Sequence, residues 1–476
     1  MVSDNPVGTP LHELAAHPNV TARFGASDRL DPYWDGMWSN GTSATWLSNE
    51  LAQRHIRSGL GVLPAHMLMT PERAAQILRS AKSRGVRLSA LGAVDQWRTM
   101  SGEQLAAVTG WPQLASTRSN VLLAAFTAGV LDFGEFATPL RRGKALDRAR
   151  LVRPSKSQAF DETILPTLTQ QERVSVTAGY PWDFRRQYDR HNLLSTELGL
   201  RVAEFCEVGT VLGEKLSTAD LLTWSGLGRT GKCPDHGAAD LTVVRSDGLR
   251  VAVELTASSG QDFAAKVRRW ARLLSSNSLA SSGVVILFVE AAPPGTAVHT
   301  SSRQHLFAQV TKQIARVVTE FPGTAGDRVA ARIGVARWED WFPASHQATR
   351  GFVSMDAVRP TGPPGARWEP VSLLDPFDMV FEPHRPEAMT AVVGNASMLL
   401  GVPNWLRRAD HAPLLWPRMM EAAGLDELPT SPPSRIGRFT GARSAFAAGI
   451  PGLTTAPDRM RVDIRGWPGT GSTTRR

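Results

Sequence analysis

The pattern of apolar and polar residues is most regular in the region that follows residue 100. Ser101 can cap a first helix, which Gly110 ends, and a second helix begins near Ser116. The inward face of the second helix is formed by Val121, Leu122, Ala125 and Phe126. From Val130 the pattern changes to an alternation of period two, as in a β-hairpin. Two helices followed by a hairpin predict a winged helix-turn-helix over residues 76–140.

The second helix of a winged helix enters the DNA major groove through its N-terminal residues. Here these residues offer short polar donors and one guanidinium group. We therefore expect contacts with DNA from Ser116, Thr117, Arg118 and Asn120. Any three-helix bundle gives similar spacing, and winged helices also bind proteins, so a protein-interaction module is the alternative interpretation.

The basic residues change this picture because they are concentrated in one place. The chain has 53 Lys+Arg and 44 Asp+Glu, a formal net charge of +9. The segment 141–156 alone holds seven basic residues and one acid, and Arg141, Arg142 and Lys144 open it. We expect this segment to contact DNA phosphates. The other interpretation is a solvated basic linker between domains, over residues 141–186.

Residues 187–342 have the pattern of an α/β domain. A helical stretch comes first, then two strands joined by a tight turn at Asp247-Gly248, and then further helices that alternate with strands. Asp240 begins the first strand of the pair and Glu254 lies near the end of the second, so the turn can bring both carboxylates to one end of the sheet. Two carboxylates suit Mg²⁺, which would polarise a phosphodiester. A third acid can come from Glu197 or Glu204 on the preceding helix.

These strands, Ala239-Asp240-Leu241-Thr242-Val243-Val244 and Val251-Ala252-Val253-Glu254-Leu255-Thr256, resemble the PD-(D/E)XK nuclease superfamily. The chain is most similar to the replication-relaxation family of actinobacterial plasmids and integrative elements, over roughly residues 90–340. The resemblance implies an N-terminal winged helix joined to a degenerate restriction-endonuclease-like fold.

Two departures from the superfamily pattern concern catalysis. Ala239 stands where the superfamily has proline, and Thr256 stands where a nuclease has lysine. A lysine at that position steadies the negative charge that develops on phosphate, which threonine cannot do. Lys266, on the following helix, is a candidate for a relocated lysine. The other interpretation is that catalysis is lost and the fold is kept as a DNA-binding scaffold.

The remaining boundaries follow from composition. Residues 1–75 are expected to form an N-terminal arm with short helices. Residues 343–476 form a Pro/Gly/Arg-rich, partly irregular region, since 17 of the 32 prolines lie after Trp341. Two cysteines are too few for a disulfide framework, and no apolar run reaches the roughly 20 residues that cross a bilayer. We therefore expect a cytoplasmic protein without a membrane partner.

Together these patterns predict an α/β multidomain protein that binds double-stranded DNA. The resemblance to the replication-relaxation family implies a role in replication, relaxation or conjugative transfer of a plasmid or mobile element, with replication or conjugation proteins as expected partners. The first alternative is an active Mg²⁺-dependent endonuclease that uses Asp240, Glu254, Lys266 and Glu197, with Asp240 and Glu254 as metal ligands. Mg²⁺ is expected only in that case. The second alternative is a non-catalytic protein-interaction scaffold.

Overall fold

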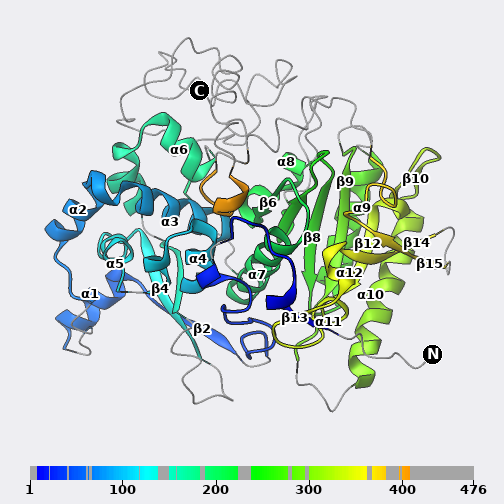
Figure 1. Cartoon of the computed structure of the whole chain (residues 1–476), viewed down its shortest axis with the longest axis horizontal. Coiled ribbons are helices and arrows are strands. Elements are labelled where there is room, and N and C mark those ends of the chain that lie inside the picture. Colours follow the sequence, from blue (N-terminus) through cyan, green and yellow to red (C-terminus); the bar gives the residue numbers. More distant parts are fainter. Residues whose placement is uncertain are drawn as a thin grey trace, which may run out of the picture.

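The computed structural model describes residues 8–407, apart from residues 21, 40–41, 60–62, 64–66, 117, 138–149, 157, 179, 183–187, 223–236, 277–280, 295–299, 362–366, 382–395 and 397–398. It is a mixed α/β protein with two main sheets (Figure 1). Within the described residues, every helix is too short or too polar to cross a membrane.

The N-terminal half is built on a small antiparallel sheet with the strand order β2-β4-β5-β3. Its strands and helices, in chain order, are β2 (Ser43–Leu47), α1 (Asn49–Arg57), α2 (Pro71–Arg79), α3 (Arg84–Trp97), β3 (Met100–Ser101), α4 (Gly102–Thr109), α5 (Asn120–Thr127), β4 (Leu131–Ala137) and β5 (Arg150–Pro154). Ser101 and Gln104 form a capping box at the start of α4, and Gly110 ends that helix in the left-handed conformation. The predicted helix start at Ser101 and helix end at Gly110 are therefore confirmed.

Helix α5 lies inside the N-terminal half. Every residue from Val121 to Phe126 is buried, and α2 packs against the helix. Ala74 and Leu78 are the buried residues of α2. Only the two ends of α5 therefore reach solvent.

The C-terminal half is built on a seven-stranded sheet with the order β15-β14-β12-β9-β8-β7-β6. Its main elements are α7 (Asp189–Phe205), β6 (Thr210–Gly213), β7 (Leu241–Val244), β8 (Arg250–Thr256), α9 (Gln261–Ser276), β9 (Val284–Glu290), α10 (Thr300–Glu320), β12 (Ile333–Arg337), β14 (Asp356–Pro360) and β15 (Trp368–Ser372). Strands β6, β7 and β8 form an antiparallel meander, and β8, β9 and β12 run parallel through the crossover helices α9 and α10. Gly248, with φ of 90°, lies in the predicted tight turn between β7 and β8, which is confirmed.

Helices α9 and α10 cover one face of this sheet with an apolar core that includes Trp270, Phe288 and Ile314. Helix α7 lies on the other face, between the sheet and the N-terminal half (Figure 1). The sheet does not stop at Phe342, since β14 and β15 extend it beyond β12. The smaller elements are β1 (Thr9–Pro10), α6 (Gln170–Thr177), α8 (Ala219–Leu222), β10 (Gly323–Thr324), β11 (Asp327–Arg328), α11 (Trp338–Trp341), β13 (Gln347–Ala348) and α12 (Arg350–Val353).

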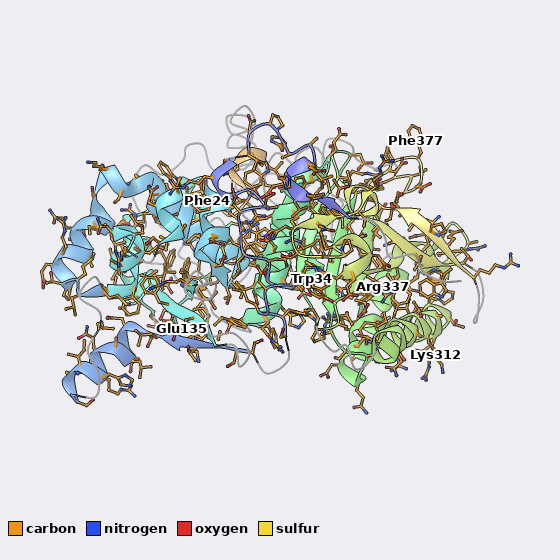
Figure 2. The ribbon with its side chains drawn as sticks, turned by 60° about the horizontal axis from the view of Figure 1, so that its bottom comes forward. Phe24, Trp34, Glu135, Lys312, Arg337 and Phe377 are labelled. Carbon is orange, nitrogen blue, oxygen red and sulfur yellow. The ribbon has the colours of Figure 1, made fainter. Side chains whose placement is uncertain are left out.

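The N-terminal arm crosses both halves and is fixed by backbone contacts. Strand β1 pairs with β13, and the Trp38 indole donates to the Ala291 carbonyl at 2.7 Å. The Trp34 indole donates to the Phe342 carbonyl at 3.1 Å, and Figure 2 shows Trp34 in the middle of the protein. The arm is therefore part of the fold.

A buried ion-pair network joins the arm to α7. Arg29 donates to Glu197 at 2.9 Å and also pairs with Glu204, and Arg201 donates to Asp31 at 2.8 Å and to Glu197 at 3.1 Å. Burial alone would raise the pKa of Glu197, but Arg29 and Arg201 outweigh it and lower that pKa to about 2. Glu197 is thus ionised and held by two arginines.

Trp97, at the end of α3, fixes the two halves against each other. Its indole donates to the Gly401 carbonyl at 2.7 Å, and its ring lies over Gly199 of α7 and Gly213 of β6. A Cβ atom at Gly199 would stand 2.5 Å from the ring. The absence of a side chain there is therefore a packing requirement.

We expect Gly199→Ala to lower the free energy of unfolding by about 2 kcal/mol, because the new methyl group overpacks a buried indole. Denaturant unfolding followed by tryptophan fluorescence measures this change. Gly326→Ala is the matched control, since nothing lies within 4 Å of a Cβ atom there. Equal stability of the two variants would show that the contact with Trp97 is not tight.

Candidate functional site

The register of β7 and β8 places Asp240 next to Glu254. Leu241 pairs with Val253, so the preceding Asp240 lies across from Glu254. The Asp240 amide donates to the Val253 carbonyl at 2.9 Å, and its carboxylate accepts a 2.7 Å hydrogen bond from the Leu255 amide. The two carboxylates lie at one end of the central strands, as the hairpin pattern predicts.

Glu254 is completely buried, and both of its oxygens are already bound by donors. Oε2 accepts from Lys266 Nζ at 2.6 Å, Oε1 accepts from Trp270 Nε1 at 2.6 Å, and the Arg269 guanidinium lies 3.6 Å from Oε1. The three donors lie within one turn of α9, at the spacing that places side chains on one helix face. The relocated lysine predicted from the sequence thus reaches the carboxylate, and its own side chain is 31% exposed.

Burial and charge act against each other in this cluster. Burial raises the pKa of Glu254, the neighbouring Asp240 raises it further, and Lys266 opposes both effects. Burial also raises the pKa of Asp240, again against Lys266. For Lys266 burial lowers the pKa, but Glu254 and Asp240 outweigh it and the pKa is raised. Lys266 is therefore positively charged at neutral pH.

Glu197 does not belong to this cluster. Its partners are Arg29, Arg201 and Gln104, because it lies on the face of α7 that packs against the arm and the N-terminal half. Glu204, the other helix glutamate considered, is held by Arg29 and by the Ala26 amide.

The acid nearest to Asp240 on its other side is Glu214, which sequence reasoning missed. Gly213 of β6 pairs with Leu241, so Glu214 follows β6 at the position across from Asp240. Its carboxylate accepts a 2.9 Å hydrogen bond from Asn192 of α7. Burial raises the pKa of Glu214, and Asp240 and Glu254 add to the shift. The only sequence signal was an acid placed directly after an apolar strand.

His191, at the start of α7, is a neutral neighbour of the cluster. Burial lowers its pKa to about 4, with additional effects from the positive charges of Lys266 and Arg190 and a small opposing one from Glu254. The rings of Trp38 and Tyr188 pack against the imidazole edge to face. His191 is therefore uncharged at neutral pH.

The cluster does not fit Mg²⁺ in this arrangement. A hard cation needs free carboxylate oxygens, and those of Glu254 are taken by an ammonium group and an indole. In the parts of the chain that the structure describes, no three His, Cys, Asp or Glu side chains are arranged to hold a metal ion. Glu254 is a buried carboxylate whose charge is balanced by Lys266, and the neighbouring Asp240 is half-buried.

The predicted DNA-contacting residues divide into two groups. Ser116, Arg118 and Asn120 are exposed at the N-terminal end of α5, where the Ser116 hydroxyl accepts from the Arg118 amide at 3.1 Å. Thr117, Arg141, Arg142 and Lys144 lie outside the described residues. The burial of the rest of α5 limits any contact by this helix to its tip.

The described part of the basic segment begins with β5 of the small sheet, which pairs with β4, and residues 138–149 between these strands lie outside the described residues. Arg153, within β5, faces inward, stacks 4.0 Å from the centre of the Trp46 ring and lies 3.4 Å from Asp132. Arg153 therefore serves packing within the small sheet.

We expect the stability that depends on His191 to be fully present above about pH 6.5 and to be lost as the pH falls toward about 4, because its pKa is lower in the folded protein than in the unfolded chain. Between pH 7 and pH 5 this amounts to about 2 kcal/mol. The measurement is urea unfolding at both pH values for the wild type and His191→Asn. Equal losses in the two proteins would contradict the assignment.

Comparisons with protein-family models, with curated proteins and with solved structures gave no match for this chain. What the site does is therefore inferred from its own residues.

Proposed function

We propose that this protein binds double-stranded DNA and acts in replication, relaxation or conjugative transfer of a plasmid or mobile element. The observation that carries the proposal is the pairing of strands β4 and β5, between which the sequence has its most basic stretch. Residues 138–149, which include Arg141, Arg142, Lys144 and Arg148, connect the paired strands β4 and β5. The sequence between these two strands has four basic residues and one acid, a composition that suits the DNA backbone, where phosphate contacts supply most of the affinity.

The order of elements in the N-terminal half supports a winged helix. Strand β3 lies between α3 and α4, α5 follows α4, and the paired strands β4 and β5 come last. Strand β3 also pairs with β5. In this interpretation the basic connection is the wing.

The C-terminal half supports a nuclease-like core. Its order α7, β6, β7, β8, α9, β9, with an antiparallel meander and one parallel strand, is typical of the PD-(D/E)XK fold. In this proposal β7 and β8 correspond to the motif strands, with Asp240 directly before β7 and Glu254 within β8. The role in replication or transfer follows from the resemblance of these strands to the replication-relaxation family. We propose that the core is a degenerate nuclease that keeps its fold for binding.

We expect the triple substitution of Arg141, Arg142 and Lys144 by Ala to weaken duplex binding roughly 100-fold at 0.1 M salt. The plot of log K against log salt should become shallower by about 2.7, since each lost phosphate contact removes about 0.9. Fluorescence anisotropy with a labelled duplex over a salt series measures both quantities.

The matched control removes three exposed basic residues from the opposite side of the protein. Arg272 of α9 and Lys312 and Arg316 of α10 are replaced by Ala, and Figure 2 shows Lys312 far from Glu135 of the β4 hairpin strand. Equal loss of affinity in the control would mean that net charge, and not the hairpin, determines binding. A wild type that shifts no duplex at low salt would favour the protein-interaction scaffold.

One observation favours a second candidate function, a metal-dependent endonuclease. The Lys266 ammonium lies 2.6 Å from Glu254, so the chain brings an aspartate, a glutamate and a lysine together although Thr256 replaces the motif lysine. The indole of Trp270 on the same carboxylate argues against metal binding there.

We expect supercoiled plasmid to be bound and not nicked when Mg²⁺ or Mn²⁺ is added, because the oxygens of Glu254 are occupied. Agarose gels report nicking, and a gel shift of the same samples reports binding. Metal-dependent nicking that disappears in Glu254→Gln, a variant that keeps the side-chain shape, would establish the endonuclease instead.

A further inference from the structure

Helix α5 is poorly suited to enter a DNA groove along its length. A recognition helix needs exposed polar side chains that reach base edges over about two turns. In α5 the six residues Val121–Phe126 are apolar and buried, and α2 packs over the helix. The position at which a winged helix would present its recognition helix is covered by another helix.

The covering helix carries the side chains that α5 lacks. Arg73, Gln76 and Arg79 of α2 are all exposed, whereas Ala74 and Leu78 are buried. The exposed residues are three positions apart and so lie along one stripe of the helix. Arg73 donates to the Gln76 amide oxygen at 2.6 Å, which orders the stripe.

The geometry points to α2 as the helix with which this protein contacts duplex DNA, an inference that rests on the proposed function. Arginine binds guanine O6 and N7 with two hydrogen bonds, and glutamine does the same with adenine N6 and N7. Arg73 and Arg79 are separated by about 9 Å along the helix axis. This is close to three base-pair steps of about 3.4 Å each, so neighbouring bases lie within reach of the stripe.

The charge of the surrounding surface agrees with a DNA partner. Helices α1 and α2 form the outer end of the N-terminal half in both views (Figures 1 and 2). Asn49, at the start of α1, donates to the Thr127 carbonyl at the end of α5, which places α1 beside the buried helix. The exposed basic residues of this end are Arg54, Arg57, Arg73, Arg79 and Lys82, against the acids Glu50 and Glu72.

The ion pairs of this surface leave most of its positive charge available. Arg54 is paired with Glu50 at 2.8 Å, within α1. The partner of Arg73 is an uncharged amide, so its positive charge is not neutralised by that contact. A neutral or acidic partner surface would gain less from this stripe than a polyanion does.

The test is a charge reversal on each helix. We expect Arg73→Glu with Arg79→Glu to weaken binding to the preferred duplex at least about tenfold and to relax the preference among duplex sequences, as the loss of two bidentate base contacts requires. Arg118→Glu, at the tip of α5, should change affinity by less than about threefold. An unchanged Tm in thermal unfolding shows that the substitutions leave the fold intact. The double variant Arg73→Ala with Arg79→Ala removes the same two charges without adding negative ones.

The outcomes separate this inference from the proposal on which it rests. Suppose that the α2 variants bind duplex DNA as tightly as the wild type, whereas the triple variant of Arg141, Arg142 and Lys144 binds it more weakly. The role of α2 is then refuted, and the proposal that the protein binds DNA stands. A large loss in Arg118→Glu alone assigns the contact to the tip of α5 and also refutes it. Absence of binding by the wild type refutes both.

Discussion

Helix α7 carries two glutamates and an arginine into a part of the protein that water does not reach, and a buried ion without a partner costs several kcal/mol. Arg29 and Asp31 of the N-terminal arm supply the opposite charges. With the arm in place, Gly199 in the middle of α7 packs against Trp97. His191 and Asn192, at the start of α7, lie beside the cluster that contains Asp240 and Glu254. The mutual position of the two halves and the shape of the candidate site thus both depend on neutralised charge inside the protein.

Local patterns in the sequence were sufficient where the structure is set by neighbours along the chain. The β7–β8 hairpin follows from period-two alternation around a tight turn, and this turn alone brings Asp240 and Glu254 together. Lys266 could be identified because it lies on the amphipathic helix that follows. Glu197 could not be placed in this way, because the choice between the site and the arm depends on Arg29, which lies 168 residues away. Glu214 enters through strand register, which the sequence of one strand does not contain.

The same limit explains the interior of the N-terminal half. The spacing of apolar residues identified α5 and one apolar face of it. In the structure six consecutive residues of α5 are buried, because α2 packs against the helix as well. The continuation of the large sheet past Phe342 has a similar cause. Strands β14 and β15 lie in a proline-rich region. Pro370 is tolerated because β15 is the edge strand, and Pro360 is the last residue of β14. Composition predicted a partly irregular region over residues 343–476, and these two strands, of which β14 pairs with β12 and β15 with β14, are a regular part of it that composition does not identify.

The order in which the chain emerges from the ribosome gives the arm a further property. Residues 8–38 are made well before their partners, since Arg29 pairs with residues near 200, Trp38 with Ala291 and β1 with residues 347–348. The contacts of the arm therefore form in stages: Leu30 can bind Glu103 early, Arg29 and Asp31 can pair once α7 exists, and Trp38 and β1 wait for residues 291 and 347–348. Contacts of such sequence separation close slowly. A chain that stops between residues 205 and 347 therefore holds both members of every α7 ion pair, but β1 lacks its partner strand β13. The unpaired start of the arm is then a site at which proteases cleave.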